Sequence, residues 1–332
     1  MEDLNQNRLF SVILIAYNRK EFIGRAIDSI KNQTLDKELY ELICITNYDL
    51  EIGAKESIHI HHIKMTGTIG AFIRSGIEKA SGKFICILED DDEFEEYKLE
   101  HIMKVLEFTD FDYYKDSMSI IDEFDNLINQ NKESYHSDRS NLELIDKNYY
   151  YSLRKLRYTF QMRGVPSTLT FKRDKILKIL DNMSLIESEI GHYIYYRFID
   201  LDLKLILDHR QLTRYRISKI SDSSALSYSD YIKVRRNYVK RTMKTYKMLI
   251  PALKDRRIKE LVANEEASLI TEESFINYGR PKFTYFIKSL KFYVLSKSAT
   301  KAIIYNTLDI YSYLFYPKLY SKGRYMIESR WK

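Results

Sequence analysis

The 332-residue sequence is poor in the residues that interrupt or cross-link a chain, with 10 glycines, 4 prolines and 2 cysteines. Few Gly and Pro residues exclude a chain made largely of flexible linker or low-complexity sequence. With 45% hydrophobic residues, the chain can bury one large core or two smaller ones. The two cysteines, Cys44 and Cys86, each lie in an apolar run, so we expect small buried side chains rather than a disulfide.

Long apolar runs are also missing. The longest one, "AIIYNTLDIYSYLFY", is interrupted by Asn306 and Asp309 and is shorter than the roughly 20 residues that a membrane span needs. The first residues, "MEDLNQNRLF", are acidic and polar and do not have the pattern of a secretory leader. The sequence therefore predicts a cytoplasmic protein without a transmembrane helix.

The charges are distributed unevenly along the chain. Residues 1–224 hold 31 Lys and Arg against 38 Asp and Glu, whereas residues 225–332 hold 22 against 9. The overall net charge of +6 thus belongs to the last third. This division predicts an acidic body followed by a cationic region that meets a polyanionic surface.

Strand-like and helix-like patterns alternate over the first hundred residues. Apolar runs of strand length are followed by segments with apolar residues at helical spacing, which is typical of an α/β protein with right-handed crossovers. The first expected helix, 18–33, has Asn18 as its expected cap. The second, 70–82, is expected to end at Gly82. The expected strands are "LFSVILIAY", "YELICIT", "SIHIHHIKM" and "KFICIL".

The ends of three of these strands carry polar residues. In open parallel sheets, ligands bind beyond the carboxyl ends of the strands. We therefore expect one crevice where "AYN" (Ala16, Tyr17, Asn18), "TN" (Thr46, Asn47) and the acidic run "EDDD" (Glu89, Asp90, Asp91, Asp92) meet.

Four adjacent carboxylates repel one another, and a divalent cation would relieve that cost. Mg²⁺ or Mn²⁺ binds carboxylates together with water and substrate phosphates. The alternative is a solvated helix start, because "DDEFEEYKLEHI" places acids near the positive end of a helix dipole. Charge alone does not decide between the two.

In order and spacing, these segments resemble the nucleotide-sugar glycosyltransferases of family 2. The resemblance rests on "SVILIAYNRKEFIGRAIDSIKNQT", "GAFIRSGIEKASGKFICILEDDDEF", "GVPSTLTFKRDKIL" and "ILDHRQLTRYRISKISDSS". It implies a GT-A fold, a mostly parallel, Rossmann-like sheet flanked by helices, over residues 1–224. The nucleotide-sugar-binding half would cover about 8–104 and the acceptor half about 105–224, and a basic helical region would follow at 225–332.

The resemblance also implies roles for residues. Asp91, with Asp92 close by, would bind the metal, and Glu89 or Asp90 would lie near the ribose. Arg74 would face the phosphates. Residues expected to border the nucleotide are Ala16, Tyr17, Asn18, Thr46 and Asn47, although the family usually has an acid where "CITNYD" offers Thr46 and Asn47.

The implied reaction is inverting transfer of a sugar from a nucleoside-diphosphate sugar to a glycan or lipid-linked acceptor in cell-surface glycan assembly. Charge on the leaving diphosphate would be stabilised by the metal and Arg74. Glu189, or alternatively Glu187, would take the proton from the acceptor hydroxyl. Either acid is equally well explained as a helix amino-terminal residue without a catalytic role. A lipid-phosphate acceptor would need little help from a base.

Several other residues have two interpretations. His59 and His61 alternate on one side of a short strand, and without a third ligand we expect a solvated face rather than zinc. His192 is expected to be structural. Arg214, Tyr215 and Arg216 are weaker expectations for the acceptor side, where the resemblance places them.

The basic region 225–332 combines helical apolar spacing with Lys and Arg. In one segment Phe283, Phe286, Ile287, Leu290 and Val294 form a stripe, which favours either packing on the catalytic body or peripheral contact with the inner face of the cell membrane. Nucleic-acid binding through this region is a rival hypothesis that the net negative first two thirds oppose. A third hypothesis is a nucleotide-sugar-binding protein without turnover. The sequence leaves the oligomeric state open.

Overall fold

The computed structural model describes residues 8–51, 58–128, 142–145, 164–218 and 228–278. These residues divide into two compact units. One unit lies within Met1–Asp146 and Met162–Ile217, and the other within Lys147–Gln161 and Ser218–Lys332. The domain boundary expected at residues 224 and 225 lies outside the described residues and stays a prediction.

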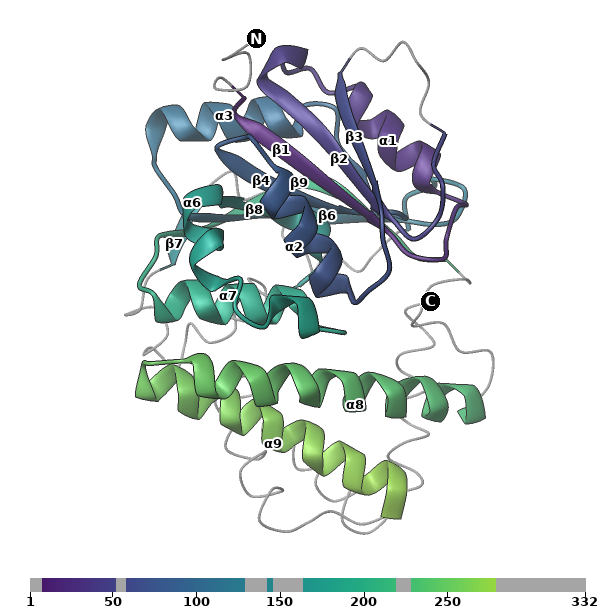
Figure 1. Ribbon diagram of the computed structural model, residues 1–332, viewed down its shortest axis with the longest axis vertical. Helices are drawn as coiled ribbons and strands as arrows, with labels where there is room; N and C mark the ends of the chain where they lie inside the picture. Colours follow the sequence, from purple (N-terminus) through teal and green to yellow (C-terminus); the bar gives the residue numbers. More distant parts are fainter. Residues whose placement is uncertain (1–7, 52–57, 129–141, 146–163, 219–227, 279–332) are drawn as a thin grey trace. The chain divides into compact units, whose positions relative to one another are not determined.

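The first unit is a mixed α/β structure around one sheet (Figure 1). Its order is β3-β2-β1-β4-β8-β6-β9-β5, and β7 also pairs with β9. The strands are β1 (Phe10–Ala16), β2 (Tyr40–Thr46), β3 (His59–Lys64), β4 (Phe84–Glu89), β5 (Glu93–Phe94), β6 (Tyr113–Ile121), β7 (Leu142–Ile145), β8 (Leu169–Lys172) and β9 (Leu205–Arg216).

Strands β3, β2, β1 and β4 are neighbours in this order, and all four are parallel. Every residue of β1 and β2 is buried, which explains why these strands are nearly continuous apolar runs. The expected strands are therefore confirmed, with Cys44 and Cys86 free and buried as predicted. Beyond β4 the sheet is mixed, because β8 is antiparallel to both β4 and β6 while β6 and β9 are parallel.

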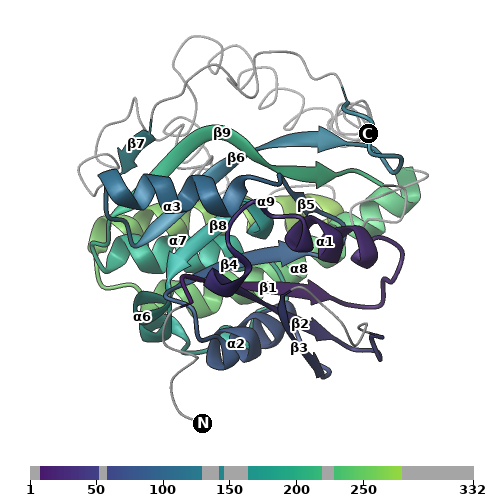
Figure 2. The ribbon, with the colours of Figure 1, turned by 90° about the horizontal axis from the view of Figure 1, so that it is seen from above.

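Helices cover both faces of this sheet (Figures 1 and 2). On one face, α1 (Ile23–Lys31) and α3 (Lys98–Phe108) pack their apolar side chains on alternate residues of β1, β2 and β4. On the other face, α2 (Ile69–Lys79) approaches β1 closely at Gly76. A Cβ at Gly76 would lie 2.5 Å from Cγ2 of Ile13, so a larger residue there would push α2 away from the sheet.

The second half of the unit positions the last strand. A turn, η2 (Pro166–Thr168), leads into β8, as the Pro-marked turn predicts, and the short helical segments α6 (Arg173–Ile176), η3 (Leu177–Ile179) and η4 (Met183–Leu185) follow. Helix α7 (Ile190–Asp200) is almost entirely buried. Its Phe198 ring packs on Tyr113 of β6 and on Phe171 of β8 at centroid distances of 5.5 and 6.1 Å.

Two expected helix ends are wrong. Helix α1 begins at Ile23 with Phe22 as its cap, and Asn18 lies in the preceding loop with a left-handed φ of 60°. Helix α2 ends at Lys79 with Ala80 as its cap, before Gly82. At Gly82 a Cβ would lie 2.5 Å from the carbonyl carbon of Phe10, so this glycine permits close backbone packing rather than ending the helix.

The second unit contains α8 (Tyr228–Ala252) and α9 (Arg256–Tyr278), which pack against each other through buried apolar residues such as Val239, Leu249 and Val262. No described helix is both long enough and apolar enough to span a bilayer. The apolar stripe predicted from Phe283 to Val294 lies outside the described residues.

Candidate functional site

The carboxyl ends of three parallel strands meet, as the sequence predicts. The last residues of β1 and β2 are neighbours, because Ala16 pairs with Thr46. On the other side of β1, Ile15 pairs with Glu89, the last residue of β4. The loops that follow these strands therefore leave the sheet side by side, and this edge holds most of the residues predicted to bind the nucleotide sugar.

Two asparagines join the loops after β1 and β2. The backbone N–H of Asn18 donates to Oδ1 of Asn47 at 2.9 Å, and Nδ2 of Asn47 donates to Oδ1 of Asn18 at 2.6 Å. Tyr17 is 53% exposed, and its ring lies 5.8 Å from that of Phe72. Thr46 is buried, and its Oγ1 bonds Nε2 of His62 at 2.9 Å. Of the residues expected around the base, Tyr17 and Asn18 are the exposed ones.

The acidic run after β4 forms a tight turn that other strands hold in place. The N–H of Glu89 donates to Oγ of Ser167 at 3.0 Å, and the same hydroxyl donates to Asp92 at 2.6 Å. The other oxygen of Asp92 accepts from the N–H of Arg216 at 3.0 Å. Asp92 is only 1% exposed. Asp92 therefore anchors the turn, whereas Asp91 is the more accessible of the two proposed metal ligands.

A cation of the protein lies on the acids. One Nη of Arg19 contacts Oδ1 of Asp90, and the other lies 2.6 Å from Oδ2 of Asp91. Arg19 follows "AYN" directly and is held from the other side by the hydroxyl of Tyr48, which donates to its carbonyl oxygen at 2.5 Å. Although burial alone would lower the pKa of Arg19, Asp91 and Asp90 raise it overall.

Burial and mutual repulsion disfavour the ionised forms of these acids. Burial, with Asp91 adding to it and Arg19 opposing it, raises the pKa of Asp90 to about 7. Burial and the charge of Asp91 raise the pKa of Asp92 to about 8. Burial and the three aspartates raise the pKa of Glu89 well above its usual range. One arginine therefore does not offset the negative charge of four neighbouring carboxyl groups.

This donor set fits a hard divalent cation. It consists of carboxylate oxygens without sulfur or imidazole, which Mg²⁺ and Mn²⁺ prefer. The guanidinium of Arg19, between Asp90 and Asp91, marks where positive charge is stabilised. The chemistry of these residues therefore agrees with the metal role that the sequence predicts for Asp91.

The remaining predicted site residues lie on α2 and on the segment that leads into α7. Arg74 lies on α2, is partly exposed and pairs with Glu78 at 2.8 Å. The N-terminal turn of α2 bonds the segment before α7, because the N–H of Gly70 donates to the carbonyl oxygen of Ile186 at 3.0 Å. That segment continues into Glu187 and Glu189. The two proposed bases therefore lie in the sequence directly after a residue that a backbone hydrogen bond joins to α2.

Glu189 has an unusual backbone for its residue type. It caps α7 with φ 58° and ψ 40°, in the left-handed region that glutamate seldom adopts. Its carboxylate lies 3.1 Å from Nε2 of His192, one turn further along the helix. Strain of this kind is often retained at functional sites, and it favours a specific role for Glu189.

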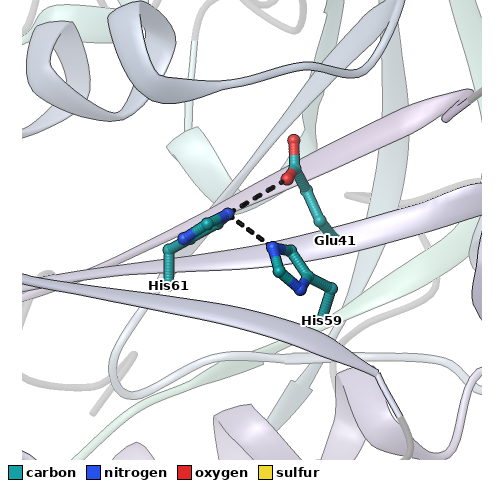
Figure 3. A group of neighbouring side chains, drawn as sticks. All are labelled: Glu41, His59 and His61. Atoms are coloured by element: carbon teal, nitrogen blue, oxygen red, sulfur yellow. Dashed lines mark hydrogen bonds and ion pairs between the residues drawn. The ribbon is translucent and has the colours of Figure 1, made fainter. Parts of the chain in front are cut away.

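A second group of ligand-type side chains lies toward the amino ends of β2 and β3 (Figure 3). Glu41, His59 and His61 come together, with their ligand atoms all within 4.8 Å of one another. The expectation that the histidines have no third ligand is therefore wrong. Glu41 lies 18 residues before His59, and only the pairing of β2 with β3 brings them together.

Sequence reasoning missed Arg19 and Ser167 as parts of the site and misplaced Arg216. The Arg216 side chain is buried, and its Nε donates to the carbonyl oxygen of Asp91 at 2.9 Å. It supports the acidic turn instead of contacting an acceptor. Arg19 had a signal in the sequence, because a cation beside "AYN" is close to any anion bound at the strand ends.

Comparison with known proteins gives a consistent result. A family model described as "Glycosyl transferase family 2" matches residues 11–179. An uncharacterized glycosyltransferase of Rickettsia bellii is 35% identical over 121 residues, which is 34% of this chain and 17% of that protein. A poly(ribitol-phosphate) beta-glucosyltransferase of Bacillus spizizenii is 30% identical over 92 residues, 25% of this chain and 14% of that protein. Each match thus spans less than a fifth of the relative's length.

Solved structures share the fold. S. aureus TarS 1-349 in complex with UDP-GlcNAc superposes with a TM-score of 0.54 at 14% identity, covering 87% of this chain and 82% of that one. The complex of the same protein with UDP has a TM-score of 0.54 at 13% identity, covering 87% and 80%. The likeness agrees with the GT-A fold that the sequence resemblance implies.

Proposed function

Because this chain belongs to glycosyl transferase family 2, we propose that it transfers a sugar from a nucleoside-diphosphate sugar to a glycan or lipid-linked acceptor in cell-surface glycan assembly. The proposed reaction inverts the anomeric carbon, with the acceptor base acting on the side of the sugar opposite the donor phosphates. Two relatives support the substrate class, one named as a poly(ribitol-phosphate) beta-glucosyltransferase and one as a minor teichoic acid biosynthesis protein.

The observation that carries this proposal is the uncompensated acidic turn at the carboxyl ends of β1, β2 and β4. Buried carboxylates that repel one another destabilise the fold unless a cation joins them. Arg19 offsets only part of their negative charge. The raised pKa values of Asp90 and Asp92 reflect the repulsion and burial that Arg19 does not offset. A binding site for a cation bridging to phosphate explains why such a turn is retained.

Within this site, Asp91 is the principal ligand for Mg²⁺ or Mn²⁺, and Asp92 fixes the turn from behind through Ser167 and the N–H of Arg216. When bound, the metal supplies positive charge to the diphosphate as it leaves the sugar. Glu89 and Asp90 lie beside the ribose. Tyr17 and Asn18 border the base, with Thr46 and Asn47 holding the neighbouring loop. Arg74 contributes charge to the phosphates once it is released from Glu78.

The chain's own proton acceptor is Glu189. Its carboxylate takes the proton from the acceptor hydroxyl, and His192, 3.1 Å away, orients it. Glu187 is the alternative, because it belongs to the same segment anchored to α2 through Ile186. Replacing each by Gln distinguishes them, because only the variant of the true base loses turnover while keeping its affinity for the nucleotide.

An anionic partner for the second unit fits its charge. Five exposed cations of α8 follow helical spacing and form one face, Lys233, Arg236, Lys240, Lys244 and Lys247. Such a face attracts phosphate groups, whether in a glycan polymer or in lipid headgroups at the membrane surface, with each cation contributing about 1 kcal/mol near an anionic surface. Replacing three of them by Glu should abolish salt-sensitive binding to the anionic partner. Separate binding assays with a phosphate-containing polymer and with anionic vesicles identify which of the two is bound.

The test of the proposed function is a thermal-shift panel of nucleoside diphosphates and nucleotide sugars, starting with UDP and UDP-GlcNAc, with and without Mn²⁺. We expect one nucleotide to raise the midpoint only when the metal is present, and the Asp91→Asn variant to lose this effect. Stabilisation without release of the sugar in the presence of acceptor would indicate a binding protein without turnover. No stabilisation by any nucleotide would contradict the proposal.

A further inference from the structure

The amino ends of β2 and β3 bring two histidines and a glutamate to the same face of the sheet. Glu41 and His59 pair directly in the parallel register, and His61 follows two residues later on the same face. Figure 3 shows the His59 and His61 rings pointing toward each other, with the Glu41 carboxylate beside them. Because Glu41 is five residues before the end of β2, this group lies roughly 17 Å along the strand from the catalytic edge.

The distances within this group are those of ligands that share a centre. Nε2 of His59 lies 2.7 Å from Nε2 of His61, which in turn lies 3.7 Å from Oε2 of Glu41. A zinc ion with bonds of about 2.0 Å in tetrahedral geometry separates its ligands by about 3.3 Å, so the two observed separations lie on either side of that value. Side-chain rotations that lengthen the first separation by about 0.6 Å and shorten the second by about 0.4 Å would bring both to that value, and all three ligand atoms already lie within 4.8 Å of one another.

The Glu41 carboxylate is already held in position by the sheet and the loop after α2. Its Oε1 accepts from Oγ of Ser11 at 2.6 Å, from the N–H of Ser81 at 2.7 Å and from Oγ of Ser81 at 2.8 Å. Its Oε2 remains directed toward His61 and toward Arg8, whose Nη1 lies 3.6 Å away. A ligand fixed by neighbouring hydrogen bonds in this way is characteristic of metal sites.

We propose that Glu41, His59 and His61 form a binding site for a transition-metal dication of the zinc type, separate from the acidic turn that binds the nucleotide. Two imidazoles and one carboxylate are the donors that zinc accepts, with water in the fourth position. Each histidine binds through Nε2 and keeps its proton on Nδ1. The site ties β3, which among the described strands pairs with β2 alone, to β2.

The experiment uses the full chain with Asp91→Asn, which reduces Zn²⁺ binding at the acidic turn. Zn²⁺ affinity and stoichiometry are measured by competition with a chromophoric chelator. We expect one saturable site, and an affinity lowered at least about tenfold in both His59→Gln and His61→Gln. Zn²⁺ should raise the thermal unfolding midpoint of the parent chain but not of these two variants.

His62→Gln is the matched control. This histidine lies on the same strand but on the opposite face, where it bonds Thr46, and its replacement should leave zinc affinity unchanged. His59 is exposed, so His59→Gln is expected to fold, which circular dichroism without metal checks. Absence of a saturable site, or equal affinity in the His59, His61 and His62 variants, overturns the proposal.

Discussion

Two buried aspartates in this molecule have the same exposure, but their pKa values are shifted in opposite directions. Asp92 in the acidic turn and Asp208 on β9 are each 1% exposed. Burial alone would raise the pKa of Asp208, but His101, the hydroxyl of Tyr114 and the N–H of Arg210 lower it overall. Asp92 also accepts two hydrogen bonds, from Ser167 and Arg216, yet burial and Asp91 raise its pKa to about 8.

The difference comes from the neighbours rather than from burial or the presence of hydrogen bonds. Asp208 is surrounded by donors and stabilises the packing of β9 on β6 and α3. Asp92 has other carboxylates beside it, and their repulsion opposes its ionisation; the proposed cation would relieve that repulsion. An acid surrounded by hydrogen-bond donors is therefore structural, whereas a group of acids that repel one another at strand ends indicates a binding site.

The largest expected effect is on turnover, at the acids after β4 that repel one another. Replacing Asp91 by Asn removes the principal metal ligand, so we expect transfer to fall about 10²–10³-fold. The free energy of unfolding should change little, because the substitution also relieves repulsion. Steady-state transfer assays and denaturant unfolding measure the two quantities. Asp110→Asn, at an exposed pair with Lys172, is the control and should alter neither.

The next effect is on stability and compares the two aspartates directly. Asp208→Asn leaves at least one of three donors poorly satisfied, and we expect the free energy of unfolding to fall by about 2 kcal/mol. Asp92→Asn also weakens a hydrogen bond but removes a repelled charge, so its cost should stay below about 1 kcal/mol. Urea unfolding at neutral pH measures both. Equal losses in the two variants would contradict the comparison.

The pH dependence of stability should separate the same two variants. The pKa of Asp208 is lower in the folded protein than the usual 3.8, so its charge stabilises the fold above that pH. The contribution is lost as the pH falls below 3.8 and through the folded pKa. The stability gap between wild type and Asp208→Asn should therefore be present at pH 5 and narrow below pH 3.8. A stability gap that does not narrow below pH 3.8 would show that packing and hydrogen-bond geometry, and not the charge of Asp208, cause the loss of stability.

The smallest predicted effect concerns the arginine on the acids. Arg19 contacts Asp90 and Asp91 in place of a metal, so it competes with Mn²⁺ in the absence of nucleotide. Arg19→Ala should tighten Mn²⁺ binding about tenfold, which is about 1.4 kcal/mol and well below the Coulomb limit for two adjacent charges. Electron paramagnetic resonance of free Mn²⁺ measures it. Arg25→Ala, on the adjacent α1, should leave the affinity unchanged.

Much of the first unit could be predicted because its strands are buried on both faces. Apolar runs identified β1, β2 and β4, and the acids after β4 pointed to the edge where the candidate site lies. Helix ends were harder, because Asn18 is a good cap by residue type but is bonded to Asn47 on the next loop. Local propensity gave way there to a contact between loops that are separate in the sequence.

The contacts that decide the site's electrostatics could not be predicted from one sequence. Arg19 and its acidic partners are about 70 residues apart, and Ser167 contacts Asp92 from the turn η2, 75 residues later in the chain. Glu41 was overlooked for the same reason, since parallel pairing with β3 is needed to place it beside His59 and His61. Residue types suggested the chemistry, and only the sheet order brought the partners together.

The most direct test of this account is Mn²⁺ binding in the presence and absence of a nucleoside diphosphate, measured in the full chain and in Asp91→Asn. The account predicts that the nucleotide tightens Mn²⁺ binding in the wild type and that the variant loses both metal and nucleotide. Nucleotide binding and sugar transfer that need no divalent metal and are unchanged by Asp91→Asn would contradict it.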